Sequence, residues 1–252
     1  MDYDKLLNLG SELGRLLMNS GAEIYRVEES VTRLLMAYGV EPQVFAIPNC
    51  LIVSVDTPEG RPLTRMCRIP AHGTDIELLE RCNDLCRAWC INPVSVDEAL
   101  EQLPRAEGGW RRFSPNVTLL GYAMTGAFFC AFFGGNLRDF CCAGLVGLIL
   151  GLYMLHGHRL VGSNSFFRTV VGAAMSSVLS LVLVRLGLGQ HEDLITIGVL
   201  MLLVPGMALT NAMREIMAGD IISGVNRTAE VILIATAIAL GTALPLLATW
   251  LH

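Results

Sequence analysis

Charge is scarce in the C-terminal part of this sequence. Residues 114–252 hold only 6 of the 18 Lys and Arg residues and 6 of the 23 Asp and Glu residues of the 252-residue chain. The chain as a whole is 53% hydrophobic, which is more apolar than an average soluble domain. This uneven distribution predicts a polar head, residues 1–113, followed by a membrane domain, residues 114–252.

Several functional motifs are also missing. The net charge is −5, and no cluster of Lys and Arg with interleaved aromatic residues occurs, so we expect no nucleic-acid partner. No Gly-rich phosphate loop occurs, so we do not expect ATP to drive the protein. The eight cysteines form no Cys-x-x-Cys pair, which favours small buried thiols and predicts neither a metal site nor a cofactor.

The head shows two kinds of hydrophobic pattern. Apolar residues first recur at helical spacing, and short β-type runs follow, two of them joined by the turn sequence DTPEG. The sequences TDIE (74–77) and SVDE (95–98) fit the capping box that opens a helix. A compact α+β domain is therefore predicted, with helices at 4–18, 23–38, 75–90 and 96–103 and strands at 43–47, 51–55 and 63–69.

The rest of the chain can supply five apolar segments of about 20 residues, the length that crosses about 30 Å of hydrocarbon. Small residues such as Gly144, Gly147 and Gly151 recur in them and let helices approach closely. We expect a polytopic α-helical membrane protein whose spans lie at about 116–135, 139–157, 167–187, 194–213 and 228–250.

Charged loop residues predict the orientation of these spans. Trp110, Arg111 and Arg112 precede the first span and suit the headgroup layer of the cytoplasmic leaflet. With the head in the cytoplasm, more loop arginines lie inside than outside, as the positive-inside rule requires. We therefore expect the N-terminus in the cytoplasm and the C-terminus outside. The inside arginines are Arg159, Arg168, Arg214 and Arg227, and the outside ones are Arg138 and Arg185.

A helix breaker interrupts the fourth predicted span. Pro205 and Gly206 lie about half-way along it, and proline lacks an amide hydrogen and clashes with the preceding turn, so the helix should kink or break there. A helix half that starts at mid-depth directs its free amides towards a carboxylate. Asn211 and Arg214 follow on one face and can bind a polar group and a carboxylate. The alternative is an ordinary kink, with Arg214 only reaching the headgroups.

Further charges follow in a glycine-flanked turn and in the next helix. Asp220 is a candidate proton carrier or gate, because ionisable groups at membrane depth are costly and tend to be retained for function. It can pair with Arg214 or Arg227. Arg227 and Glu230 are also gating candidates, although two such residues three apart can form an ordinary pair on the helix surface.

Two stretches resemble one family. LVPGMALTNAMREIMAGDIISGVNR (203–227) is similar to the membrane signature of the threonine/serine exporter family, and SGAEIYRVEESVTRLLMAYG (20–39) resembles its N-terminal motif. The resemblance implies a multi-pass exporter of the bacterial inner membrane with a cytoplasmic N-terminal domain. The matching positions are Pro205, Gly206, Asn211, Arg214, Gly219, Asp220 and Gly224 in the membrane motif and Gly21, Glu23, Arg26 and Glu28 in the head motif.

Within this family, the chain resembles the longer subunit of a split exporter such as the succinate exporter. That resemblance implies a smaller membrane partner subunit, a homo-oligomer or both. It also implies a small carboxylate-bearing substrate, either an amino acid such as threonine or serine or a dicarboxylate such as succinate. Two roles stay open for the head motif, which is either a structural latch or a substrate gate at the inner face of the membrane.

Two other classes of function compete with transport. One alternative hypothesis is that the head is a hydrolase. The sequence AHGTD (71–75) would supply His72 and Asp75 as its site residues, but no nucleophile elbow or metal-binding His-Glu pair accompanies them. A membrane-anchored sensor needs no polar pathway through its spans, and the polar cluster after Pro205 argues against it. We therefore expect a transporter and not an enzyme.

Overall fold

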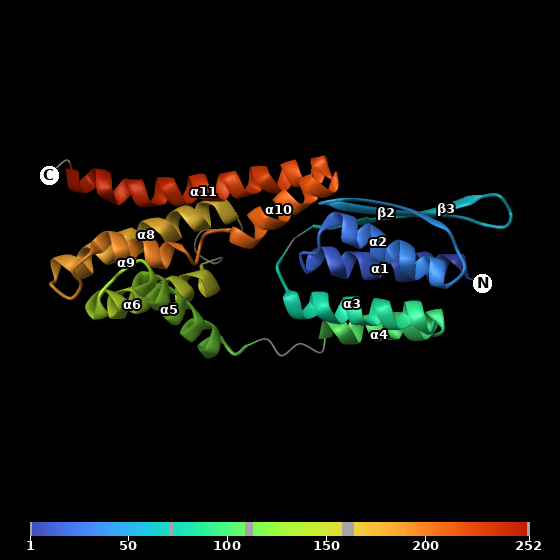
Figure 1. Ribbon diagram of the computed structural model, residues 1–252, viewed down its shortest axis with the longest axis horizontal. Helices are drawn as coiled ribbons and strands as arrows, with labels where there is room; N and C mark the ends of the chain where they lie inside the picture. Colours follow the sequence, from blue (N-terminus) through green and yellow to red (C-terminus); the bar gives the residue numbers. More distant parts are fainter. Residues whose placement is uncertain (1, 71–72, 109–112, 158–163, 251–252) are drawn as a thin grey trace. The chain divides into compact units, whose positions relative to one another are not determined.

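The computed structural model describes residues 2–70, 73–108, 113–157 and 164–250 (Figure 1). The chain forms two compact units. We call the first the head unit, which combines Met1–Arg111 with Thr210–Thr228, and the second the helical unit, which combines Arg112–Leu209 with Ala229–His252. Trp110, Arg111, Arg112, Arg159 and His72, which the sequence analysis singled out, lie outside the described residues.

The head unit contains the predicted helices and strands. Helices α1 and α2 precede an antiparallel three-stranded sheet of order β1-β2-β3, and helices α3 and α4 follow it. The register places Val44 of β1 opposite Val53 of β2, and Val53 opposite Arg65 of β3. The bounds are α1 Tyr3–Asn19, α2 Ile24–Ala37, β1 Pro42–Ile47, β2 Cys50–Asp56, β3 Pro62–Arg68, α3 Ile76–Ile91 and α4 Val96–Gly108.

The core of the head unit follows from these sequence patterns. Every apolar residue that the helical spacing turns inward on α1 and α2 is buried, and alternate residues of β2 pack into the same cluster because side chains alternate between the faces of a strand. The α+β prediction for this region is confirmed. The buried residues are Leu6, Leu9, Leu13, Leu16, Leu17, Ile24, Val27, Val31, Leu34, Leu35, Leu51, Val53 and Val55.

One predicted helix cap is wrong. The residue that caps α3 is Asp75, whose Oδ1 accepts a hydrogen bond from the Leu78 amide over 3.2 Å, and not Thr74. A carboxylate at the N-terminus of a helix also interacts favourably with the helix dipole, which explains the start one residue later. The other predicted cap is confirmed, because Ser95 Oγ accepts from the Glu98 amide over 3.3 Å.

The helical unit contains α5 Pro115–Phe132, α6 Leu137–His156, α8 Ser165–Arg185 and α9 Glu192–Leu200, together with the first residues of α10 Gly206–Ala218 and most of α11 Ile221–Trp250. Helices α5 and α6 approach closely at the predicted small residues. A Cβ atom added to Gly147 would lie 2.7 Å from the carbonyl oxygen of Tyr122, so glycine at this position lets the two backbones pack together.

A buried carboxylate that no sequence motif indicated joins two loops of the helical unit. Asp139 is fully buried and accepts hydrogen bonds from the backbone amides of Asn136, Gln190 and His191. Its Oδ2 also lies 2.8 Å from Nδ1 of His191. These bonds satisfy both carboxylate oxygens, and they fix the α5–α6 loop against the α8–α9 loop.

Three helices among the described residues are long and apolar enough to cross a membrane, namely Leu137–His156, Ser165–Arg185 and Ile221–Ala243. They correspond to three of the five predicted spans. The first predicted span forms α5, which has 18 residues and is not among these three. The last one begins at Ile221 and not near residue 228, because Gly219, with a φ of +99°, ends α10 and the next helix starts directly after it.

The fourth predicted span, 194–213, is not one helix. Helix α9 ends at Leu200 and α10 begins at Gly206, so the predicted break at Pro205 is confirmed. Residues 201–205 between the two helices are not α-helical, so the interruption is a break and not only a kink. At 9 and 13 residues, neither helix alone reaches across about 30 Å of hydrocarbon at a rise of about 1.5 Å per residue.

The α3 cap can be tested with two neighbouring variants. We expect Asp75→Ala to lower the free energy of unfolding by about 1 kcal/mol, because the helix loses its capping carboxylate. Thr74→Ala should change it by less than about 0.5 kcal/mol, as an exposed substitution away from a cap usually does. Urea unfolding of the full chain in detergent, followed by circular dichroism, measures both. If Thr74→Ala lowered the free energy of unfolding more than Asp75→Ala, Thr74 and not Asp75 would be the residue that caps α3.

Candidate functional site

The site is built around the turn between α1 and α2. Gly21 in this turn has a φ of +91°, and a Cβ atom there would lie 2.6 Å from the carbonyl oxygen of Gly73, so the position requires glycine. Glu23 occupies the N-cap position of α2, yet its side chain makes no capping hydrogen bond. The turn therefore presents backbone groups and one carboxylate to other parts of the head unit.

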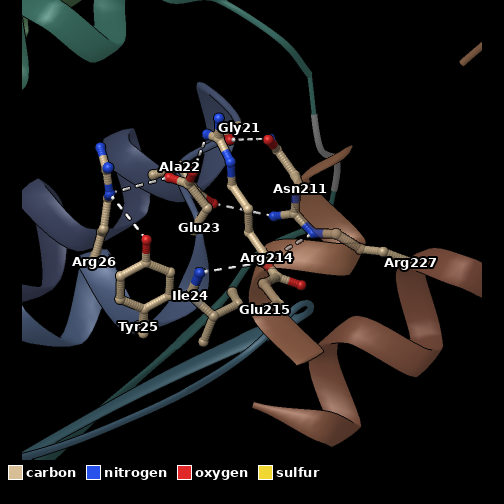
Figure 2. Close-up of polar contacts among 10 residues, drawn as sticks. All are labelled: Gly21, Ala22, Glu23, Ile24, Tyr25, Arg26, Asn211, Arg214, Glu215 and Arg227. Carbon is tan, nitrogen blue, oxygen red and sulfur yellow. Dashed lines mark hydrogen bonds and ion pairs between the residues drawn. The ribbon is translucent and has the colours of Figure 1, made fainter. Parts of the chain in front are cut away.

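Helices α10 and α11 supply the partners of this turn (Figure 2). Four of their side chains bond to four consecutive residues that lie about 190 positions earlier in the sequence. The two motifs that carry the family resemblance therefore meet in space. Asn211 Nδ2 donates to Gly21 O over 3.5 Å, Arg227 Nη2 to Ala22 O over 3.1 Å and Arg214 Nη1 to Glu23 Oε1 over 3.1 Å, and the Ile24 amide donates to Glu215 Oε1 over 3.3 Å.

The Glu23–Arg214 pair joins a buried carboxylate to a guanidinium that reaches the surface. The Glu23 side chain is 7% exposed and that of Arg214 is 57% exposed. Oε2 of Glu23 also lies 3.5 Å from Nε of Arg26, so one carboxylate interacts with two guanidinium groups. Arg26 also donates to the Tyr25 hydroxyl over 3.3 Å. Arg26 thus lies at the margin of the site, as Figure 2 shows.

Glu215 is a residue of this contact that the sequence did not single out. It is fully buried, and it takes over the capping of α2 from Glu23 by accepting the Ile24 amide. Its Oε1 also lies 3.2 Å from Nε of Arg227, whose side chain is 15% exposed. One signal for it existed in the sequence, because Glu215 follows Asn211 by four residues and so shares a helix face with it.

Burial raises the pKa of Glu215 above its ordinary value. The charge of Arg227 and the hydrogen bond from the Ile24 amide act in the opposite direction, and the nearby carboxylates of Asp220 and Glu23 add to the rise. Burial also raises the pKa of Glu28, against the hydrogen bond that the Ala46 amide donates to its Oε1 over 2.7 Å. Glu28 thus accepts a hydrogen bond from β1 and takes no part in the contact of residues 21–24 with α10 and α11.

The remaining predicted site residues fall into three groups. Asp220 lies near the contact, but Arg214 and Arg227 form their ion pairs with Glu23 and Glu215 instead of with Asp220 or Glu230. Glu230 is exposed on α11. Pro205 and Gly206 belong to the helical unit, where they stand at the break before α10.

The two motif glycines let α10 and α11 form a tight pair within the head unit. Gly219 adopts the positive φ of the connecting turn. A Cβ atom on Gly224 would lie 3.0 Å from the carbonyl oxygen of Ala212 and closer still to the Ile216 side chain, so α11 starts against the backbone of α10. The glycines thereby bring Arg227 to the same turn that α10 contacts.

The alternative sites gain no support from the geometry. Asp75 of the hydrolase reading caps α3, and its proposed companion His72 is outside the described residues. All eight cysteines are free thiols. Within the described ranges, no group of three or more His, Cys, Asp and Glu side chains is placed to hold a metal ion.

Comparison with known proteins identifies the family. Residues 8–247 match the family model described as "Putative threonine/serine exporter". This chain therefore belongs to the threonine/serine exporter family, which confirms the resemblance seen in the two motifs, and it is a membrane protein with several spans. No solved structure matches it.

Three curated relatives are fungal proteins named pheromone-regulated membrane protein 10. Those of Pichia sorbitophila and Debaryomyces hansenii are 25% and 26% identical to this chain, each over 83% of it. That of Kluyveromyces lactis is 24% identical over 85% of it. The matches cover 21%, 21% and 23% of the relatives, so this chain spans about a fifth of their length.

The Glu23–Arg214 contact can be tested by a double-mutant cycle. We expect Glu23→Gln and Arg214→Gln to show a coupling free energy of about 1 kcal/mol, since one partner is buried while solvent screens the other. The exposed pair Glu29–Arg33 on α2 is the matched control and should give about 0.4 kcal/mol. Unfolding of the full chain measures both cycles, and equal coupling in the two would show that burial of Glu23 adds nothing.

Proposed function

We propose that this protein is a secondary transporter that exports a small carboxylate-bearing metabolite, either an amino acid such as threonine or serine or a dicarboxylate such as succinate. Membership of the exporter family supports transport. The observation that carries the proposal is the contact of the two family motifs at one partly buried ionic site, where Glu23 binds Arg214. Family membership likewise favours a transporter over an enzyme.

Arg214 is the proposed carboxylate-binding residue. A guanidinium has five N–H donors and binds a carboxylate by two parallel hydrogen bonds. The bond to Glu23 uses one of these donors, and more than half of the Arg214 side chain is open to solvent. A substrate carboxylate can therefore replace Glu23 on Arg214, while the amide of Asn211 exchanges its long bond to Gly21 for a bond to the second polar group of the substrate.

The break at Pro205 and Gly206 has a role in the same proposal. Helix α10 starts at Gly206 and carries Asn211 and Arg214, so its positive dipole end and its side chains share one element. A helix N-terminus favours an anion. We assign this turn to the path by which the substrate carboxylate approaches or leaves Arg214.

The head motif then acts as a gate. Glu23 covers Arg214 from the head side, and Gly21 supplies both the turn and the carbonyl group that Asn211 contacts. Asp220 and Arg227 are proposed to control the opening of this contact, and Glu230 to assist them from the exposed face of α11. The close fit of a motif carboxylate on a motif arginine favours a gate over a purely structural latch.

We further propose the arrangement in the membrane. The five predicted spans, at about 116–135, 139–157, 167–187, 194–213 and 228–250, cross the bacterial inner membrane, with the N-terminus in the cytoplasm, the C-terminus outside, and Glu215 and Asp220 in the cytoplasmic connection between the last two spans. The excess of arginines in the inside loops supports this orientation. A smaller membrane subunit, a second copy of the chain or both complete the pathway, as in the split exporters that the chain resembles.

Transport can be tested in proteoliposomes that contain the full chain with and without a co-expressed small membrane partner. Uptake or release of labelled serine, threonine and succinate identifies the substrate. We expect Arg214→Ala to lower the flux at low substrate concentration by about tenfold or more, the effect of losing about 1.4 kcal/mol of binding. Arg214→Lys should retain part of the flux, because lysine keeps the charge and loses the bidentate geometry.

Arg185→Ala is the matched control, since Arg185 is an exposed arginine at the end of α8. It should leave the flux unchanged. Full flux in Arg214→Ala would remove Arg214 from the substrate path. If none of the three substrates crosses the bilayer with either preparation while the full chain cleaves a model ester or amide, the hydrolase reading replaces the exporter.

A further inference from the structure

Glu215 carries a carboxylate oxygen that the fold leaves without a hydrogen bond. Its Oε1 accepts the Ile24 amide and faces Arg227, whereas Oε2 is buried and has no hydrogen-bond partner among the described residues. An ionised carboxylate oxygen that is removed from water and left unbonded is costly. A proton on Oε2 neutralises the charge and so lowers that cost.

Other acidic groups surround Glu215. Glu23 faces it from the α1–α2 turn, and Asp220 faces it from the turn between α10 and α11. Oδ2 of Asp220 is also buried and, in the described part of the chain, has no hydrogen-bond partner. The charge of Asp220 in turn raises the pKa of Glu28 on α2.

Two arginines, Arg227 and Arg214, lie among these four carboxylates, which belong to Glu23, Glu28, Glu215 and Asp220. Arg227 on α11 forms an ion pair with Glu215 through Nε, and its Nη2 donates a hydrogen bond to the carbonyl oxygen of Ala22. Arg214 is next to Glu215 in the sequence, but it binds Glu23. Counting Arg26, which reaches Glu23 from a mostly exposed position, the cluster still has one more acid than base. Uptake of one proton balances it.

We propose that Glu215 binds a proton while α10 is docked on the α1–α2 turn, and that this proton holds the docked arrangement together. Asp220 is the neighbouring acid that shares the site. The proposal rests on the function proposed above where it treats this proton as the coupling ion of export. The binding site itself does not depend on transport.

The direction of the pH dependence follows from linkage. Burial raises the pKa of Glu215 in the docked state, whereas a solvated carboxyl group has its ordinary pKa. Protons therefore bind more tightly to the docked state. The contribution of Glu215 to docking is fully present below its ordinary pKa and is lost as the pH rises through the raised pKa.

This site makes proton and substrate binding alternate. With the proton on Glu215, α10 stays docked and Glu23 occupies Arg214. When the proton leaves, docking weakens and Arg214 becomes available to a substrate carboxylate. Two ligands that favour opposite states of one element exclude each other thermodynamically. Alternation of this kind is what the exchange of an outgoing carboxylate for an incoming proton requires.

Hydrogen exchange at the α1–α2 turn tests the site without any transport assay. The full chain is exchanged in lipid nanodiscs between about pH 5 and pH 9, and the protection of peptides that contain the Ile24 amide is corrected for the intrinsic rate. We expect protection to fall by about tenfold across this range, because the docked state loses its bound proton as the pH rises through the raised pKa of Glu215.

Glu215→Gln is the key variant because it keeps the side-chain shape and the Oε1 acceptor but carries no charge. It should stay protected at every pH, whereas Glu80→Gln, at an exposed position of α3, should follow the wild type. Protection of the wild type that does not change with pH would overturn the proposal. So would loss of protection in Glu215→Gln at every pH, because the contact would then need the ionised carboxylate.

The outcome separates the proton site from the exporter. Protection that depends on pH in a protein that moves none of the tested carboxylates would leave the proton site standing and contradict the proposed function. Carboxylate export together with protection that does not depend on pH would support the proposed function and contradict the proton site.

Discussion

The carboxylate of Glu215 is the interaction on which the head unit's second segment depends. It lies between the first amide of α2 and the guanidinium of Arg227, and it connects three elements at one buried point. Residues 210–228 count as part of the head unit although 98 residues of the helical unit precede them in the chain. Because α2 has no cap of its own, the start of this helix is completed by a residue from α10. Any movement of α10 therefore changes the N-terminus of α2.

This constraint explains why Glu23 can have another role. A carboxylate at the N-terminus of a helix interacts favourably with the free amides there, but at α2 it is Glu215 that binds the first amide. The carboxylate of Glu23 is thereby released for Arg214 and Arg26. The capping of α2 by Glu215 and the pairing of Glu23 with Arg214 therefore occur together.

Local patterns predicted most of the head and part of the site. Helical spacing placed the buried residues of α1 and α2, and turn chemistry placed the sheet, because these features depend on neighbours in the sequence. The motif match selected Gly21, Glu23, Asn211 and Arg214 without showing that they touch. Their contact joins positions about 190 residues apart, which no local pattern encodes.

The incorrect expectations have a common origin. Arg227 was paired with Glu230 or Asp220 because these lie near it in the sequence, whereas its tertiary partner is Glu215 on the preceding helix. The last span is predicted to start near residue 228, whereas α11 begins at Ile221, because Gly219 in the connecting turn adopts a positive φ and lets the new helix start there. The cap of α3 moved from Thr74 to Asp75 because two capping residues stand side by side there. In each case a local preference was overruled by a stronger partner or by the backbone.

In the proposed transport cycle, a substrate carboxylate takes the place of Glu23 on Arg214. The most direct test is an experimental structure of the full protein in lipid nanodiscs with its transported carboxylate bound. We expect the substrate carboxylate on the guanidinium of Arg214, its second polar group at Asn211, and Glu23 moved away from the arginine. A bound substrate elsewhere in the protein, with the Glu23–Arg214 pair intact, would contradict it.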